Sequence, residues 1–225
     1  MSAQASEPGH AIYGEEQGVE MPSARSCEQP EYCWVLDPID GTKSFATGSR
    51  MYCTLVGLVN SEGEAIVGVN DSPMLGDRFA GCIGSRRESR VATMNGEAMD
   101  QTPAGSMTIE RASVYSTTPF MFSEGSEWEA YSRLAMAFGN AVFGCDGYAY
   151  GLAAAGYVGA VVEADLKAHD VLAHDAVIRA AGGELTRWGG GRVRWWPGRG
   201  PERIEAVASA DTDLHARALQ RLSGA

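Results

Sequence analysis

Two carboxylates stand three residues apart in the segment from Trp34 to Phe45, directly after a short apolar run. Pro38 stiffens the chain between Asp37 and Asp40, and Gly41 frees it for a tight turn, so both carboxylates can point into one cleft. Carboxylates this close repel each other unless a cation neutralises them, and hard oxygen ligands of this kind select Mg²⁺, Mn²⁺ or Ca²⁺. The spacing therefore predicts a divalent-metal site in which Asp37 bridges two ions and Asp40 holds one.

Neighbouring residues extend this site toward an anion. If Thr42 opens a short helix, its hydroxyl and the backbone N–H groups that follow Gly41 are placed to bind phosphate oxygens. Asp170 begins an apolar helix over 171–181, where a carboxylate complements the helix dipole and can face a cleft. Taken alone, an Asp-Pro-x-Asp-Gly segment is as readily a surface turn, and a lone Asp before a helix is usually an N-cap. Together these residues predict a phosphate group held against the metal.

The elements that must position these side chains are predicted from apolar periodicity and turn residues. Short apolar runs predict strands of one antiparallel or mixed sheet at 32–36, 52–59, 65–69 and 78–82. Further strands are predicted at 113–116, 159–163, 184–188 and 206–208, and helices at 127–138, 148–155, 171–181 and 213–222. We expect irregular chain at 1–30, apart from 11–13, and an exposed loop at 192–203. The second half therefore alternates helix and strand.

Composition narrows the class of protein. The chain has 225 residues, of which 44% are hydrophobic, enough for a sizeable core. Its net charge of −11 disfavours a nucleic-acid partner, because phosphate backbones are bound by clustered Lys and Arg. No basic start leads into an apolar run, and no apolar run approaches the roughly 18 residues of a membrane span. We therefore expect no membrane partner and, by elimination, a cytoplasmic location.

The cysteines indicate neither a disulfide framework nor a zinc site. Their number is odd, and no C-x-x-C pair occurs, so reduced structural thiols are expected. The five positions are Cys27, Cys33, Cys53, Cys82 and Cys145.

Four motifs occur in an order and at a spacing that resemble the inositol monophosphatase superfamily. They are Gly14-Glu15-Glu16, Asp37-Pro-Ile-Asp-Gly-Thr42, Glu163 seven residues before Asp170, and Ala181-Gly182-Gly183. Within that superfamily the chain is most similar to the histidinol-phosphate phosphatases. Beyond the segment that begins at Asp37, that similarity rests on Gly68-Val-Asn-Asp-Ser-Pro73, Tyr115-Ser-Thr-Thr-Pro119, Gly144-Cys-Asp-Gly-Tyr-Ala-Tyr150 and Glu163-Ala-Asp-Leu-Lys167.

The resemblance implies a set of site residues. The implied metal-binding groups are the side chains of Glu15, Asp37, Asp40 and Asp170 and the carbonyl of Ile39. Gly41 and Thr42 would bind the phosphate, and Asp146 and Glu163 would border the alcohol part of the substrate. Glu15, Asp40 and Thr42 are the expected catalytic residues. The expected cofactor is Mg²⁺, roughly two or three ions per site, with Mn²⁺ as the alternative.

The implied reaction is Mg²⁺-dependent hydrolysis of a small phosphate monoester, with L-histidinol phosphate as the expected substrate. Acidic pocket residues suit its cationic aminoalcohol, whereas an uncharged polyol needs mainly hydroxyl and amide partners. Water would attack phosphorus in line, oriented by Thr42. An ion held by Glu15 and Asp37 would lower the pKa of this water, and a second ion would stabilise the departing alkoxide. The alternatives are an inositol phosphate, a nucleotide 3′-phosphate or a sugar phosphate as substrate, or a weakly active or inactive metal-binding relic. We expect a small phosphorylated metabolite as the partner and leave a homodimer open.

The fold implied by the resemblance is an α/β layered sandwich like that of the sugar phosphatases. Members of the superfamily ordinarily begin with two helices, of which this chain shows no trace, so we expect an N-terminally truncated form. We expect an irregular segment at 1–30 that carries the Gly-Glu-Glu motif, and a single phosphatase domain at 31–225. Within that domain, a front-sheet lobe at 31–110 and a C-terminal α/β lobe at 111–225 would enclose the site.

The histidines lack the spacing of a metal-ligand pair, so we expect them to be structural. They are His10, His169, His174 and His215. His169 is the exception to watch, because it precedes Asp170. His174 and Asp175 stand where apolar helix residues are expected, and a buried Asp175 would need a partner.

Overall fold

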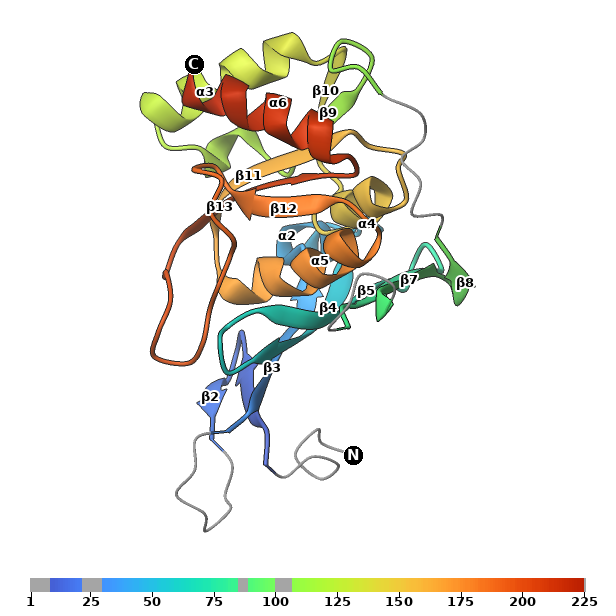
Figure 1. Ribbon diagram of the computed structural model, residues 1–225, viewed down its shortest axis with the longest axis vertical. Coiled ribbons are helices and arrows are strands. Elements are labelled where there is room, and N and C mark those ends of the chain that lie inside the picture. The colour runs from blue at the N-terminus through green and yellow to red at the C-terminus, as the bar shows by residue number, and fades with distance from the viewer. Residues whose placement is uncertain (1–8, 22–29, 85–88, 100–106, 225) are drawn as a thin grey trace.

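The computed structural model describes residues 9–21, 30–84, 89–99 and 107–224. Two mixed sheets alternate with helices in layers, which confirms the α/β layered sandwich expected from the sequence (Figure 1). In these ranges, no helix is long and apolar enough to cross a membrane. The layering matters for the site, because the candidate residues lie where the two sheets face the same helices.

The larger sheet has eight strands among the described residues, in the order β2-β1-β3-β4-β5-β6-β7-β8. They are β1 (Ala11–Gly14), β2 (Gly18–Glu20), β3 (Tyr32–Asp40), β4 (Cys53–Asn60), β5 (Ala65–Ser72), β6 (Asp77–Cys82), β7 (Val91–Met94) and β8 (Glu97–Ala98). β1 runs parallel to β3, and the other neighbours are antiparallel. Alternate residues of β4, such as Leu55 and Val59, are fully buried, as the two-residue period of a strand requires. One face of this sheet therefore packs against the helical layer.

Helix α5 (Ala168–Ala180) lies between the two sheets and is buried on nearly all sides (Figure 1). It packs against β4, β5 and β6 of the larger sheet and against two strands of the smaller one. Gly68 allows the close approach, because a Cβ atom there would collide with the carbonyl oxygen of Ala173. A helix surrounded by protein must be apolar or must pair its polar groups. The first residues of α5 are thereby held rigidly beside the end of β3.

The buried Asp175 has the partner that the sequence requires. Arg179, one helical turn later, donates two hydrogen bonds to the Asp175 carboxylate, at 2.9 and 2.8 Å, and a third to the Ala65 carbonyl at 2.6 Å. Burial raises the pKa of Asp175, and the Arg179 guanidinium opposes that rise. The pair ties the middle of α5 to β5.

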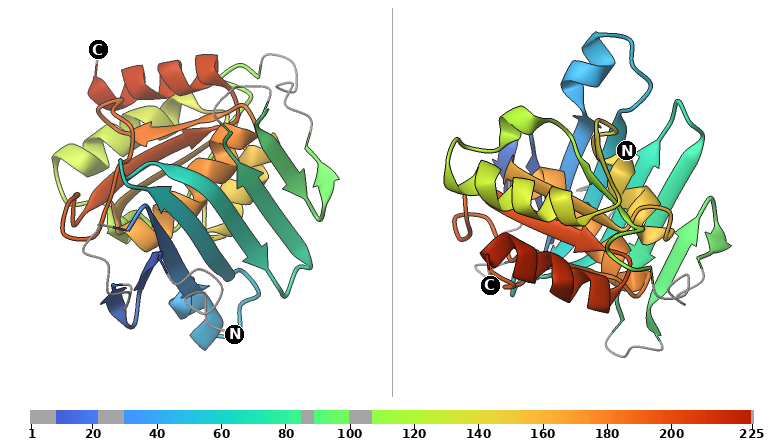
Figure 2. Two further views of the ribbon diagram at one scale, coloured as in Figure 1. Left: turned by 60° about the horizontal axis from the view of Figure 1, so that its bottom comes forward. Right: turned by 90° about the horizontal axis from the view of Figure 1, so that it is seen from above.

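The smaller sheet has the order β10-β9-β11-β13-β12. Its strands are β9 (Ser113–Ser116), β10 (Asn140–Phe143), β11 (Ala160–Leu166), β12 (Glu184–Arg187) and β13 (Ile204–Ser209). Helix α4 (Tyr148–Ala154) packs beside α5 on one face of this sheet. The short helix η2 (Pro119–Met121) lies between β9 and α3 in the sequence. Helices α3 (Ser126–Ala137) and α6 (Thr212–Ser223) lie side by side over the other face (Figure 2).

Several elements differ from the expectation. The irregular chain expected at 1–30 is wrong for β2, and β7, β8 and β10 were not expected either. Strands of two to four residues show too few alternations for a period to be visible in the sequence. The loop at 192–203 is irregular apart from a bridge between Trp196 and Arg199, and the Trp196 side chain is buried.

The remaining expectations concern the lobes and the cysteines. The four described cysteines are free thiols, and Cys27 lies outside the described residues. The division into lobes at residue 110 stays a prediction. Residues 100–106, just before that boundary, also lie outside the described ranges.

Candidate functional site

A β-bulge at the end of β3 brings the two spaced carboxylates to one side of the sheet. Pairing with β4 shifts register between Asp37 and Asp40, so the two residues belong to the strand rather than to a turn after it. In a regular strand, residues three apart point to opposite faces, and the extra residue of a bulge cancels that inversion. Asp37 is 2% exposed, and its Oδ1 accepts a hydrogen bond from the Ile39 N–H at 3.0 Å. A bulge therefore takes the place of the expected turn, and it likewise leaves both carboxylates on one side of the sheet.

Glu15 and Asp170 reach the same point from two other elements. Glu15 follows β1 and stays beside β3, because its N–H donates to the Leu36 carbonyl at 3.2 Å. Asp170 lies in the first turn of α5, which begins at Ala168 rather than at the expected residue 171. Its Oδ2 accepts a hydrogen bond from the Lys167 N–H at 2.7 Å. Four carboxylates from three segments far apart in sequence thus converge.

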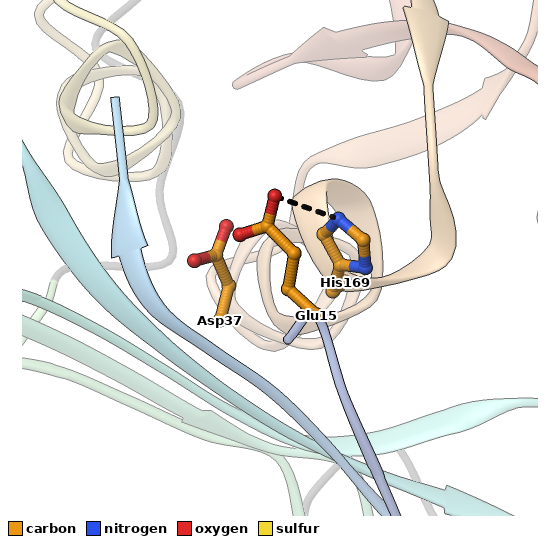
Figure 3. Close-up of side chains that lie close together, drawn as sticks. All are labelled: Glu15, Asp37 and His169. Carbon is orange, nitrogen blue, oxygen red and sulfur yellow. Dashed lines mark ion pairs between the residues drawn. The ribbon is translucent and has the colours of Figure 1, made fainter. Parts of the chain in front are cut away.

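The convergence forms two groups that share one residue. Asp37, Asp40 and Asp170 form one group, and Glu15, Asp37 and His169 form the other; within each, one ligand atom per residue lies within 4.8 Å of the others. Figure 3 shows Glu15, Asp37 and His169 pointing toward one another from the end of β1, from β3 and from the start of α5. Asp37 belongs to both groups, and the bridging role predicted for it stays a prediction.

Burial, and to a lesser extent neighbouring charges, raise the pKa values of Asp37, Asp40 and Asp170. Burial, together with the charges of Glu15 and Asp170, raises the pKa of Asp37 to about 7. Burial and the charge of Asp37 raise the pKa of Asp40 well above its ordinary value, although the Gly147 N–H donates to Asp40 Oδ2 at 2.7 Å. Burial also raises the pKa of Asp170. The donor set fits hard divalent cations, because positive charge placed among these groups stabilises all of them together.

The short helix that was expected after Gly41 is present. Gly41 has a φ of 82°, and α2 (Thr42–Ala46) begins at the next residue. The Thr42 hydroxyl donates to the Ile39 carbonyl at 3.1 Å, so this carbonyl, which the sequence resemblance gave as a metal ligand, already accepts one hydrogen bond. A carbonyl oxygen has a second lone pair and can still face a cation. The first N–H groups of α2 have no intrahelical acceptor, which suits an anion.

A strained turn places Asp146 against this helix. Cys145 and Asp146 both have positive φ, 78° and 41°, a conformation that costs roughly 1–3 kcal/mol per non-glycine residue. Asp146 Oδ2 accepts a hydrogen bond from the Ser44 hydroxyl at 2.5 Å, and burial raises the pKa of Asp146. A Cβ atom on the adjacent Gly147 would lie 2.5 Å from Asp40 Oδ2. The turn therefore couples the position of Asp146 to that of Asp40.

Glu163 is buried inside the smaller sheet rather than exposed at a strand end. It lies in β11, is 3% exposed, and accepts hydrogen bonds from the Thr117 N–H at 2.8 Å and the Tyr150 hydroxyl at 2.9 Å. Burial raises the pKa of Glu163, and both hydrogen bonds oppose the rise. Each carboxylate oxygen keeps a lone pair for a further donor.

One cavity of about 110 Å³ joins these features. Two residues of the metal-binding group, Asp40 and Asp170, and the two acidic residues assigned to the alcohol, Asp146 and Glu163, all line it. The remaining lining residues are Thr117, Met121, Gly147, Tyr150, Leu166 and His174. At about 30 Å³ per water, the space suits a small polar group rather than a large apolar ligand.

Two histidines border the site: His169, which the sequence singled out beside Asp170, and His174, which was expected to be structural only. His174 is 1% exposed, stacks on Tyr150 with ring centroids 4.2 Å apart, and has no hydrogen-bond partner at either nitrogen within the described chain. Burial lowers its pKa to about 3, so the ring is neutral. A signal existed, because His174 stands one helical turn after Asp170 and shares its face. His169, which directly precedes Asp170, belongs to the Glu15 group.

The other two histidines fit the structural role expected for them. His215 is buried and lies 2.9 Å from the Thr186 hydroxyl, and His10 packs against Tyr32 and Trp34. Neither belongs to the two groups of possible metal ligands found among the described residues.

Comparison with known proteins agrees with this geometry. A model of the inositol monophosphatase family matches residues 2–224. The chain is 41% identical over 217 residues to the bifunctional phosphatase IMPL2, chloroplastic, of Arabidopsis thaliana, a match covering 96% of this chain and 59% of that protein. It is 30% identical over 189 residues to a histidinol-phosphatase of Streptomyces coelicolor, covering 80% of this chain and 65% of that one. The chain therefore spans less than two thirds of the length of both relatives.

A solved structure resembles the whole arrangement. An inositol monophosphatase from Zymomonas mobilis superposes with a TM-score of 0.81 at 26% identity, over 98% of this chain and 78% of that one. The two sheets and the helices between them are thus an arrangement that a solved phosphatase also has.

Proposed function

We propose that this chain, which belongs to the inositol monophosphatase family, hydrolyses a small phosphate monoester with the help of divalent metal ions. We further propose that its substrate is L-histidinol phosphate. Membership of this family supports a phosphoric monoester hydrolase. The choice of substrate, the choice of Mg²⁺ and the roles of individual residues are proposals. We also keep the cytoplasmic location as a proposal.

The cavity beside α5 carries this proposal. It is lined at once by Asp40 and Asp170 of the carboxylate cluster and by Asp146 and Glu163. A phosphate monoester has an anionic end and an alcohol end, and the two sets of groups that line this cavity can contact one end each. The acidic character of the second set favours an alcohol that carries positive charge.

The metal ions would be held by the four carboxylates of the cluster and by the Ile39 carbonyl. This assignment is supported by the pKa of Asp37, which its neighbours and burial raise to about 7 in the absence of a cation. When bound, divalent ions supply positive charge to phosphoryl oxygens and lower the pKa of water, which is the chemistry that hydrolysis of a phosphate monoester needs.

Helix α2 would orient the phosphate and the attacking water. The N–H groups at its start, after Gly41, would donate to phosphoryl oxygens. The Thr42 hydroxyl donates a hydrogen bond to the Ile39 carbonyl, so the hydroxyl oxygen is left to accept a hydrogen bond from a water molecule. Thr42 would thereby fix the direction in which that water approaches phosphorus.

Asp146 and Glu163 would bind the alcohol end. The ammonium group of histidinol is a donor of three hydrogen bonds, and buried carboxylates with raised pKa values gain charge stabilisation when a cation arrives. Both residues are held in place by protein donors, Ser44 for Asp146 and Thr117 with Tyr150 for Glu163. Little side-chain ordering is then left to occur on binding.

The test is phosphate release from a substrate panel by the wild type and by Glu163→Gln. We expect the wild type to hydrolyse histidinol phosphate faster than inositol 1-phosphate, a nucleotide 3′-phosphate or a sugar phosphate. Removing the Glu163 charge should lower kcat/KM for histidinol phosphate about 10- to 100-fold. It should change kcat/KM for phosphate esters of uncharged alcohols by less than about threefold. Glu184→Gln, at the partly exposed start of β12, is the matched control. A wild type that prefers an uncharged alcohol contradicts the substrate.

An inositol phosphate is the second candidate substrate. The neutral His174 ring and the Tyr150 hydroxyl also border the cavity and can bond to uncharged hydroxyl groups. The same panel decides between the two alcohols. Stabilisation by Mg²⁺ without phosphate release from any substrate would instead support a metal-binding relic.

A further inference from the structure

The two groups in the carboxylate cluster differ in donor chemistry. Asp37, Asp40 and Asp170 offer only oxygen atoms, whereas Glu15, Asp37 and His169 offer two carboxylates and an imidazole nitrogen. We propose that Glu15, Asp37 and His169 form an oxygen–nitrogen site that binds a transition-metal dication such as Mn²⁺ or Co²⁺ in preference to Mg²⁺. This inference rests on the metal-dependent function proposed above and adds a ligand and a metal class to it.

The position of His169 is fixed from both sides of its ring. The residue is 3% exposed, so its ring cannot turn to solvent. Its Nδ1 lies 3.3 Å from the Tyr13 hydroxyl, and Tyr13 packs in turn on Trp195 with ring centroids 4.6 Å apart. Histidines that bind metals commonly have one ring nitrogen held by a hydrogen bond, which orients the other. Tyr13 provides that hydrogen bond here.

The other ring nitrogen faces the carboxylates. Nε2 lies 3.3 Å from Asp170 Oδ1 and 3.8 Å from Glu15 Oε1 (Figure 3). When Nδ1–H donates to Tyr13, Nε2 carries a lone pair that points at the lone pairs of these oxygens. Electron pairs at such distances repel each other unless a positive charge lies between them. A proton on Nε2 removes that repulsion through ion pairs with Asp170 and Glu15, and a divalent cation shared by His169 and Glu15 can take the place of that proton.

The donor types determine which cation fits. Mg²⁺ takes oxygen ligands and gives up its waters reluctantly, whereas imidazole nitrogen binds first-row transition metals well. The group of Asp37, Asp40 and Asp170 lacks nitrogen and serves as an internal comparison within the same protein. We therefore expect the two groups to differ in metal preference although they share Asp37.

The experiment is pulsed electron paramagnetic resonance of Mn²⁺ bound to the full chain, which detects coupling of the metal to a coordinating ¹⁴N nucleus. The variant is His169→Phe, which keeps an aromatic ring beside Tyr13 and removes the nitrogen. The matched control is His10→Phe, whose ring packs on Tyr32 and Trp34 with ring centroids 5.1 and 6.3 Å away. Mn²⁺ and Mg²⁺ affinities are measured on the same three proteins by titration calorimetry.

We expect ¹⁴N coupling in the wild type and in His10→Phe and its loss in His169→Phe. Mn²⁺ binding should weaken about tenfold or more in His169→Phe, while Mg²⁺ binding changes less than about threefold. Bound Mn²⁺ without ¹⁴N coupling in the wild type, or coupling that persists in His169→Phe, overturns the inference. If His169→Phe does not fold, the wild-type spectrum decides together with His169→Gln, which should lose the coupling as well.

Failure of this inference can be told from failure of the proposed function. Phosphate release is measured on the wild type with Mg²⁺ and with Mn²⁺. Metal-dependent release without nitrogen coupling contradicts the His169 site and leaves the phosphatase standing. Nitrogen coupling without release by either ion contradicts the phosphatase and leaves the metal site standing.

Discussion

Replacing Asp37 with asparagine should stabilise the metal-free protein at neutral and alkaline pH. The native carboxyl has a pKa raised to about 7 by burial and by Glu15 and Asp170, against an ordinary value of 3.8. A raised carboxyl pKa means that the folded state favours the protonated form. Its contribution to stability is present below pH 4 and is lost as the pH rises through 7. Asparagine does not titrate, and its oxygen can still accept the hydrogen bond from the Ile39 N–H.

The size of the effect follows from the shift. A rise of about three pKa units corresponds to about 4 kcal/mol at 1.36 kcal/mol per unit. The carboxylate itself is 2% exposed, but the charges that repel it belong to Glu15, which is exposed, and Asp170, which is partly exposed. Water therefore screens part of the repulsion, and about 2 kcal/mol is the expected gain. For a chain of this size, that gain raises the melting temperature by roughly 4–8 °C.

The assay is thermal or urea unfolding of the wild type and Asp37→Asn in chelator between pH 4 and pH 8. The difference between the two proteins should be near zero at pH 4 and grow until about pH 7. Taking the difference cancels His174, whose lowered pKa changes the stability of both proteins alike. Added Mg²⁺ should stabilise the wild type and reverse the order. Asp213→Asn, an exposed residue of α6, is the control. A variant that is less stable than the wild type at pH 8 without metal refutes the electrostatic reasoning.

Two other substitutions test the packing around the site. Gly147→Ala places a methyl group 2.5 Å from Asp40 Oδ2 and should lower metal-dependent phosphate release at least about tenfold, whereas Gly189→Ala, with open space around it, should not. Arg179→Met leaves Asp175 buried without a partner and should destabilise the protein by about 3–5 kcal/mol in urea unfolding, a loss that the further change Asp175→Leu should largely recover. Unchanged phosphate release by Gly147→Ala, or unchanged stability of Arg179→Met, would contradict the contacts described.

Sequence reasoning reached the parts of the site that a local pattern encodes. The spacing of Asp37 and Asp40 beside Pro38 and Gly41 predicted two carboxylates on one side, and the structure places them there. It predicted a turn, however, whereas a bulge inside β3 is what leaves both carboxylates on one side of the sheet. A bulge depends on pairing with β4, and pairing is not visible in the residues of one strand.

Features that depend on contacts between distant segments could not be predicted in the same way. The burial of Glu163 results from the packing of β11 against β9 and α4, which brings Thr117 and Tyr150 to its oxygens. The role proposed for His169 rests on its contact with Tyr13, 156 residues away in sequence. The family resemblance gave the order of the motifs but no information on residues that depart from the family pattern.

Metal-dependent phosphate release by the wild type and by Asp40→Asn tests the central claim most directly. Asp40 lies in the all-oxygen group, lines the cavity and is held by the Gly147 N–H. We predict that the wild type releases phosphate from histidinol phosphate only when Mg²⁺ or Mn²⁺ is present. Asp40→Asn should lose most of that release, because a missing ligand leaves the cation poorly held. Turnover by Asp40→Asn equal to that of the wild type would contradict the assignment of this cluster as the catalytic metal centre.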